Sequence, residues 1–104
     1  MGRIDRPDAP LCVILLRYVA PLEELDRHME AHIVWLTKGY AEGIFIASGR
    51  QVPRTGGVIL TRGHRREVEA LVATDPFVAS GAATAEVIEF TASMAAAGFA
   101  ALLP

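Results

Sequence analysis

Runs of apolar residues, separated by short polar breaks, predict four strands along this chain. Residues 11–19 are apolar at nearly every position, which is typical of a strand that is buried on both faces. Shorter apolar runs at residues 44–48, 58–61 and 84–90 predict three further strands. The stretch between the second and third strands is rich in glycine and proline, so we expect a loop that joins an antiparallel pair.

Apolar residues spaced three and four apart predict a helix over residues 22–42. Its expected buried stripe consists of Leu25, Met29, Ile33, Leu36 and Tyr40. Gly43 stands where a C-terminal capping glycine belongs, and Gly39 is expected to weaken the last turn by about 1 kcal/mol relative to alanine. Residues 65–73 predict a second helix, which the Asp75-Pro76 pair ends.

The order of these elements is β-α-β-β-α-β, the ferredoxin-like pattern in which two helices cover one face of an antiparallel sheet. We therefore expect an α+β fold with a four-stranded antiparallel sheet, formed by residues 11–90. Residues 1–10 are interpreted as a polar N-terminal arm. Residues 91–104 are interpreted as an alanine-rich C-terminal tail whose composition favours helix. No internal repeat or linker divides the chain, so one domain is expected.

This arrangement leaves the second sheet face without a cover, although the strands are apolar on both faces. In the first strand, for example, Ile14 and Leu16 alternate with Val13 and Leu15. The mean hydropathy of +0.33 is high for a small soluble monomer. We therefore expect a homodimer in which the same sheet face of a second copy covers the first.

The net charge, the length of the apolar runs and the cysteine content limit the kinds of partner and the cellular location to be expected. The net charge of −2 gives no basic excess, so a nucleic-acid partner is not expected. The apolar run at residues 11–16 is too short to span a bilayer, so no membrane partner is expected either. Cys12 is the single cysteine and lies within that run, where a buried small apolar residue is the simplest interpretation. A chain without an intrachain disulfide fits a cytoplasmic location.

Two residues that lie far apart in the sequence, His32 and Asp75, are the candidates for chemistry. Histidine titrates near neutral pH, and a neighbouring carboxylate can hold one tautomer and stabilise the charged form. Each residue also has a simpler interpretation. His32 lies beside the apolar stripe and is compatible with a hydrogen-bonded core residue, and Asp75 before Pro76 is a common helix cap.

The turn after the second strand supplies candidates for substrate binding. The Ser48 hydroxyl and the amides near Gly49 can bind an oxyanion, and Arg50 and Arg54 can hold a carboxylate or phenolate through two hydrogen bonds. The alternative for both arginines is an ordinary solvated loop. Tyr18 and Trp35 are interpreted as packing residues.

A metal site is another interpretation of these residues. His28 and His32 are four residues apart and would share a helix face, with Asp75 as a third ligand. However, His28 follows Asp26-Arg27 in a charged turn, where solvent exposure is the simpler explanation. We therefore expect neither a metal nor another cofactor.

Several segments together resemble the YciI-like (YCII-related) family of the dimeric α/β-barrel superfamily. These segments are His32-Ile33-Val34-Trp35-Leu36 with Gly43, Ser48-Gly49, Gly56-Gly57-Val58-Ile59, and Asp75-Pro76-Phe77-Val78 with Gly81. The resemblance covers about residues 11–90. It implies a ferredoxin-like fold, a His–Asp pair carried here by His32 and Asp75, and a pocket between helices and sheet at the dimer edge. The chain departs from the family pattern at two places: Arg50 stands where the family often has proline, and the loop after Arg50 is more basic. These departures leave the identity of the substrate undetermined.

Two functions from different classes remain open at this point. One is a small cofactor-independent enzyme that moves a proton on an organic acid or ring compound, with isomerase- or lyase-type chemistry. In that reading His32 is the general acid or base, Asp75 orients it, and the turn at Ser48 binds an anionic group. The other is a non-catalytic dimer that binds a small ligand as an accessory module.

Overall fold

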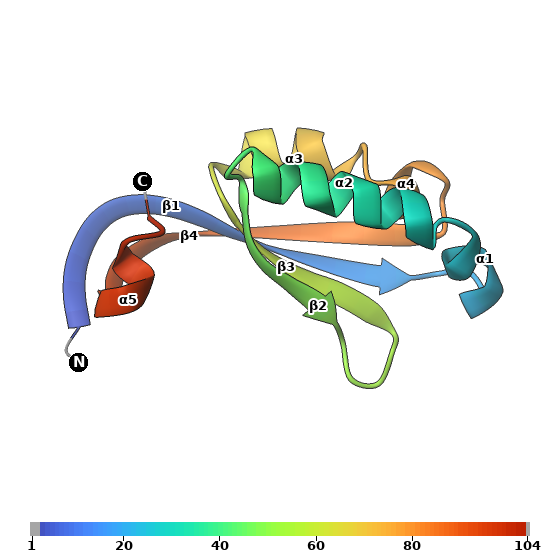
Figure 1. The fold of residues 1–104 in the computed structure, drawn as a ribbon, viewed down its shortest axis with the longest axis horizontal. Coiled ribbons are helices and arrows are strands. Elements are labelled where there is room, and N and C mark those ends of the chain that lie inside the picture. Colours follow the sequence, from blue (N-terminus) through green and yellow to red (C-terminus); the bar gives the residue numbers. More distant parts are fainter. Residues whose placement is uncertain (1–2, 104) are drawn as a thin grey trace.

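Four antiparallel strands form one sheet in the computed structural model, which describes residues 3–103 (Figure 1). The strands are β1 (Arg3–Tyr18), β2 (Phe45–Arg50), β3 (Gly56–Arg62) and β4 (Ala83–Ala96), in the order β2-β3-β1-β4. β1 therefore lies inside the sheet and pairs with both β3 and β4. The predicted α+β ferredoxin-like fold is confirmed.

The main helices lie on one face of this sheet. α2 (Met29–Ala41) and α3 (Arg65–Val72) run across it, and the single turn α4 (Pro76–Ala79) follows α3 (Figure 1). α1 (Leu22–Arg27) lies at the end where β1 leaves the sheet, and α5 (Ala97–Ala100) lies at the opposite end. None of the helices in the described part of the chain is long and apolar enough to cross a membrane.

The helix predicted over residues 22–42 is broken at His28, which ends α1 and precedes α2. The His28 N–H donates to the carbonyl of Leu25, three residues back, in place of the four-residue spacing of a continuous α-helix. The break turns α2 relative to α1. A single buried stripe through both helices was therefore a wrong expectation.

The buried face of α2 consequently differs from the predicted stripe. Ile33 and Tyr40 are 52% and 40% exposed, whereas the buried residues of α2 are His32 and Gly39. The sequence pattern missed this face because a histidine and a glycine carry no hydrophobic signal.

Gly43 ends α2 in the way that the sequence predicted. Its φ of 73° is left-handed, which glycine adopts without strain. The Gly43 N–H donates to the Tyr40 carbonyl and the Ile44 N–H donates to the Gly39 carbonyl, which is the Schellman arrangement. A Cβ on Gly39 would lie 2.2 Å from the Phe45 ring, so Gly39 is required for helix–sheet contact.

The composition of the tail favours helix, but its first part is strand. β4 continues to Ala96, and only the turn α5 follows it. The partner of this extension is the segment interpreted as an arm, because Arg3 to Asp5 pair with Ala96 to Met94. The paired ends of β1 and β4 project beyond the helices in Figure 1.

The two faces of the sheet are covered to different extents. The helix-covered face carries the main core, in which Ile14, Ile59 and Val87 are almost fully buried. Cys12 belongs to this core, as predicted, and burial raises the pKa of its thiol. The alternate positions point to the other face, where Ile88 and Phe90 are 46% and 43% exposed.

The C-terminal segment covers one end of this second face. Leu103 is buried there and packs with Ala9, Leu11 and Ala92. Between that cluster and the far ends of β1 and β3, the face remains open. We call this surface the open sheet face; its apolar residues are Val13, Leu15, Val58, Leu60, Ile88 and Phe90.

Candidate active site

His32 and Asp75 are in direct contact. The His32 Nδ1 lies 2.7 Å from Asp75 Oδ1, and the approach predicted from the sequence is thereby confirmed. His32 comes from the buried face of α2 and is 8% exposed, whereas Asp75 precedes α4 and is fully buried. α2 and α4 thus bring together two residues that are distant in the chain.

Asp75 also caps α4, so the cap and the histidine contact coexist. The Phe77 N–H donates to Asp75 Oδ1 at 3.1 Å, and Pro76 occupies the first turn of the helix. The same oxygen therefore receives both bonds. The other oxygen, Oδ2, is buried and has no hydrogen-bond partner among the described residues. The cap fixes the carboxylate, and the carboxylate in turn fixes the imidazole.

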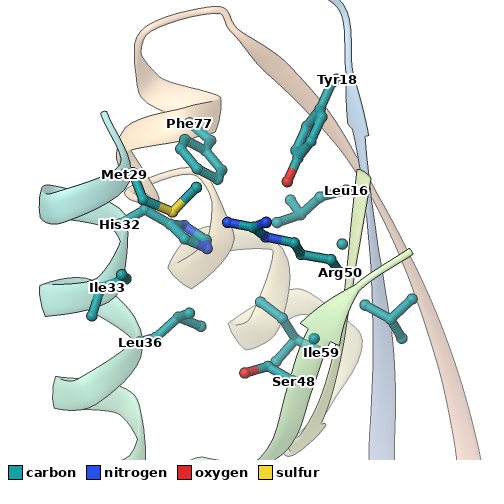
Figure 2. A pocket seen from close by; sticks show the side chains of 13 residues that line it. Leu16, Tyr18, Met29, His32, Ile33, Leu36, Ser48, Arg50, Ile59 and Phe77 are labelled. Atoms are coloured by element: carbon teal, nitrogen blue, oxygen red, sulfur yellow. The ribbon is translucent and has the colours of Figure 1, made fainter. Parts of the chain in front are cut away.

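Aromatic packing holds the imidazole plane. The Phe77 ring stacks on His32 with 3.9 Å between centroids and 11° between planes. Because Nδ1 faces Asp75, the other ring nitrogen, Nε2, is left to face the pocket that His32 lines (Figure 2). An imidazole held by a carboxylate on one side and open on the other has the arrangement of a general acid or base.

The pocket beside His32 has a volume of about 190 Å³ and lies between α2 and the sheet. Most of its wall is apolar, including Leu16, Met29, Leu36, Ile59 and Phe77. Its polar side chains are those of His32, Tyr18, Ser48 and Arg50. Such a pocket suits a small ligand that is mostly apolar and carries a few polar atoms.

Strand register explains why Ser48 and Arg50 reach the pocket. Ser48 pairs with Ile59 and Arg50 pairs with Gly57, so both side chains point to the helix-covered face. The absent side chain of Gly57 leaves room beside Arg50. The Arg50 guanidinium extends toward His32 and Tyr18 in the view of Figure 2. Gly49 also lines the pocket, and Ser48 Oγ lies 2.7 Å from the Tyr40 hydroxyl.

Arg54 does not line this pocket. Its guanidinium donates to Asp26 of α1 at 2.8 Å, and its centre lies 5.9 Å from the centroid of the Tyr18 ring. The hydrogen bond to Asp26 is the main cause that raises the pKa of Arg54, with a smaller contribution from the Tyr18 hydroxyl. A direct role of Arg54 in substrate binding stays a prediction.

His28 lies apart from the His32–Asp75 pair. Its Nε2 is 3.8 Å from Glu24 of α1, and the residue stands at the break between the two helices. The described residues contain no group of three or more His, Cys, Asp or Glu side chains that could hold a metal ion.

Tyr18 and Phe77 line the pocket, but neither was assigned to the site from the sequence. Tyr18 was interpreted as a packing residue, but its side chain lines the pocket. The alternation of the strand could have indicated this, because Tyr18 points to the same sheet face as Ile14 and Leu16. Phe77 was noted only as part of a motif, although its ring contacts both His32 and Tyr18.

Comparison with protein-family models finds a match over residues 11–91 to the model described as "YCII-related domain". This range contains every residue of the pocket, together with Asp75 and Arg54. A search of curated proteins found no match.

Among solved structures, the chain is similar to 5-chloro-2-hydroxyhydroquinone dehydrochlorinase (TftG) from Burkholderia phenoliruptrix AC1100, in complex with 2,5-dihydroxybenzoquinone. The TM-score is 0.65 at 20% sequence identity, and the alignment covers 75% of this chain and 90% of that chain. At this identity the likeness establishes a shared fold.

Proposed function

The chain belongs to the YCII-related family, and from that premise we propose that it is a small enzyme that moves a proton on a small anionic ring compound or organic acid. The chemistry is of the isomerase or lyase type and uses no cofactor. The observation that carries this proposal is the buried His32–Asp75 contact at the wall of a small, mostly apolar pocket.

In this proposal His32 exchanges a proton with the substrate through Nε2. Asp75 accepts the hydrogen bond of Nδ1–H, which keeps Nε2 free to take a proton. When Nε2 has taken it, the carboxylate stabilises the imidazolium. The Phe77 ring fixes the imidazole plane, so the base needs little reorganisation.

Substrate binding is assigned to the turn at the end of β2. Arg50 supplies positive charge for an anionic group, and Ser48 with the backbone near Gly49 supplies further hydrogen bonds. The apolar wall favours a flat ring. The bound 2,5-dihydroxybenzoquinone of the dehydrochlorinase TftG, a ring that carries several oxygens, supports this class of ligand.

We also propose that the protein is a homodimer, joined through the open sheet face. The exposed residues Ile88 and Phe90 lie there beside the partly buried Val13, Leu15, Val58 and Leu60. A contiguous apolar surface of this kind is unusual on a monomer, which seldom exposes more than a few hundred Å² in one patch. A second copy presents the same surface and covers it by symmetry. The single, buried Cys12 supports the further proposal of a cytoplasmic location.

Proton transfer can be tested before the natural substrate is known. We would incubate the protein with 2,5-dihydroxybenzoquinone in D₂O and follow the loss of the ring C–H signal by proton NMR. His32 as general acid and base should deliver deuterium to a ring carbon and remove the original proton. The exchange should therefore be faster with the protein than in buffer.

The variant His32→Ala should slow this exchange by about 100-fold or more. His64→Ala is the matched control, because His64 is an exposed histidine whose side chain is 65% accessible. Equal exchange by wild type and His32→Ala would remove His32 from the chemistry. Binding of the quinone without any exchange would favour the non-catalytic ligand-binding module.

A further inference from the structure

Tyr18 stands across the pocket from the proposed base. It is the last residue of β1, and its backbone N–H donates to the carbonyl of Thr55 in the β2–β3 loop at 3.0 Å. Its side chain leaves the sheet on the helix-covered side, and its hydroxyl points into the pocket (Figure 2). Tyr18 and His32 thus border one cavity from two different elements, β1 and α2.

One aromatic side chain ties the positions of these two residues together. Phe77 stacks face to face on His32, and it meets the Tyr18 ring edge-on, with 5.8 Å between centroids and 81° between planes. Both rings are therefore fixed against the same neighbour. A substrate in the pocket meets an imidazole nitrogen and a phenol hydroxyl at set positions.

Removal of a proton from carbon leaves an electron pair that must be accommodated. When His32 Nε2 takes the proton from a saturated carbon next to a carbonyl group, the C–H bond breaks and its electron pair moves into the π system, onto the carbonyl oxygen of the substrate. A ring carbon of 2,5-dihydroxybenzoquinone becomes saturated in this way once it has received a deuteron. Return of the proton from His32 to a carbon reverses the charge movement, so no other reactant is needed. A donor that is already aimed at that oxygen lowers the barrier, because it binds the charge that develops.

We propose that the Tyr18 hydroxyl is this donor, and therefore a second catalytic group of the pocket. This inference rests on the proposed function and adds the residue that recognises the substrate oxygen. Tyr18 keeps its proton throughout and donates a hydrogen bond. The substrate class is accordingly a ring or enolisable compound with an oxygen next to the carbon that exchanges its proton.

Arg54 is the positioning residue for Tyr18. Its guanidinium lies over the Tyr18 ring and also binds Asp26, so the β2–β3 loop is fastened to α1 and to the tyrosine. A guanidinium beside the phenol attracts its oxygen and disfavours an O–H bond that points at the cation, which leaves the hydroxyl hydrogen free for a substrate oxygen. Arg54 therefore acts through Tyr18.

The test compares Tyr18→Phe with wild type in the ring-proton exchange assay and in binding of 4-nitrophenolate. The phenylalanine keeps the packing on Phe77 and the cation over the ring, and it removes only the hydroxyl. Exchange should slow by about 100-fold, as for loss of one oxyanion donor. Affinity for 4-nitrophenolate should fall about tenfold, since a hydrogen bond to a charged group is lost. The absorption band of the bound phenolate should also shift, because the band responds to hydrogen bonding at the oxygen.

A second pair of variants tests the role of Arg54. Asp26→Asn should weaken 4-nitrophenolate binding about threefold in wild type and not at all in Tyr18→Phe, if Arg54 acts through the hydroxyl. Glu23→Gln is the matched control, because Glu23 is another exposed acidic residue of α1. An equal loss in both backgrounds would overturn the positioning role.

The outcomes separate this inference from the proposed function. If His32→Ala abolishes exchange and Tyr18→Phe leaves exchange, affinity and the band of the bound probe unchanged, the role of Tyr18 is overturned and that of His32 stands. If wild type shows no exchange, the proposed function fails. In that case the bound phenolate band still decides whether the Tyr18 hydroxyl meets the ligand oxygen.

Discussion

The Asp75 carboxylate both caps α4 and contacts His32, and the substitution Asp75→Asn separates these two roles. Asparagine also caps helices, so Asp75→Asn should retain α4 and fold. It removes the negative charge beside His32, and turnover should fall about 100-fold because the imidazolium loses its partner. Asp75→Ala, which removes the cap as well, should cost about 1 kcal/mol or more of stability. Urea unfolding and the exchange assay together measure the two effects, and undiminished turnover in Asp75→Asn would leave Asp75 as a cap alone.

The substitution Gly39→Ala tests how closely α2 packs on the sheet. Helix propensity alone favours Gly39→Ala by about 1 kcal/mol. The new methyl group, however, would lie 2.2 Å from the Phe45 ring, which belongs to the main core. We expect the steric clash with Phe45 to outweigh the gain in helix propensity, so that the free energy of unfolding falls by about 1–2 kcal/mol. Lys38→Ala, on the exposed side of the same turn, should change little; a more stable Gly39→Ala would show that Phe45 moves aside without cost.

Individual residues also show where sequence reasoning succeeds. His32 and Asp75 could be paired because each has a distinctive chemical type and a family motif around it. Tyr18 could not be assigned, because an aromatic residue at the end of an apolar strand is more often a core residue. The Phe77 stack on His32 depends on where α4 lies against α2, which no local pattern encodes.

At the scale of the elements, the first turn of α3 is hydrogen-bonded to a residue of β4. The Arg65 backbone N–H, in the first turn of α3, donates to the Glu89 carboxylate. This bond, assisted by His64, holds the pKa of Glu89 below its ordinary value of about 4.5. A carboxyl whose pKa is lower in the folded state stabilises the fold above about pH 4.5. The contribution disappears as the pH falls through the lowered value.

Glu89→Gln should therefore lower the melting temperature at neutral pH and flatten its decline in acid. We would measure melting by circular dichroism from about pH 7 to about pH 3. The gap between wild type and variant should close as Glu89 becomes protonated. Glu30→Gln, at an exposed acidic residue of α2, serves as the control. A gap that stays constant across this range would contradict the proposed charge contribution.

The ends of β1 and β4 show why the strand boundaries were missed. Residues 1–10 and 91–104 were interpreted separately, one by its polarity and the other by its alanine content. Residues 3–10 and 91–96 form strand and pair with each other, from Arg3 with Ala96 inward. Helix propensity is a local property, and pairing between distant segments overrides it. The short runs inside the sheet were predictable because their apolar residues and the turn residues between them are local signals.

At the scale of the whole molecule, a substitution in the open sheet face tests the proposed homodimer. Ile88→Lys places a charge in the centre of the proposed interface, where it would be buried without a partner. We expect light scattering to give the mass of a dimer for wild type and of a monomer for the variant at micromolar concentration. Val34→Lys is the matched control, because Val34 is 65% exposed on α2, away from that face. A monomer mass for wild type would contradict the dimer.

The strand order has a consequence for how the chain reaches this fold. Of these four strands, β1 is synthesised first and β4 last, yet they lie side by side. Closing so long a segment is slow, since the entropy of the intervening chain must be lost before any contact forms. During synthesis, the edge of β1 that later pairs with β4 therefore stays unpaired until β4 has been made. Over that time β1 also carries apolar residues on both faces. We therefore expect the nascent chain, in which this edge and these apolar faces are exposed, to be more prone to aggregation than the folded protein.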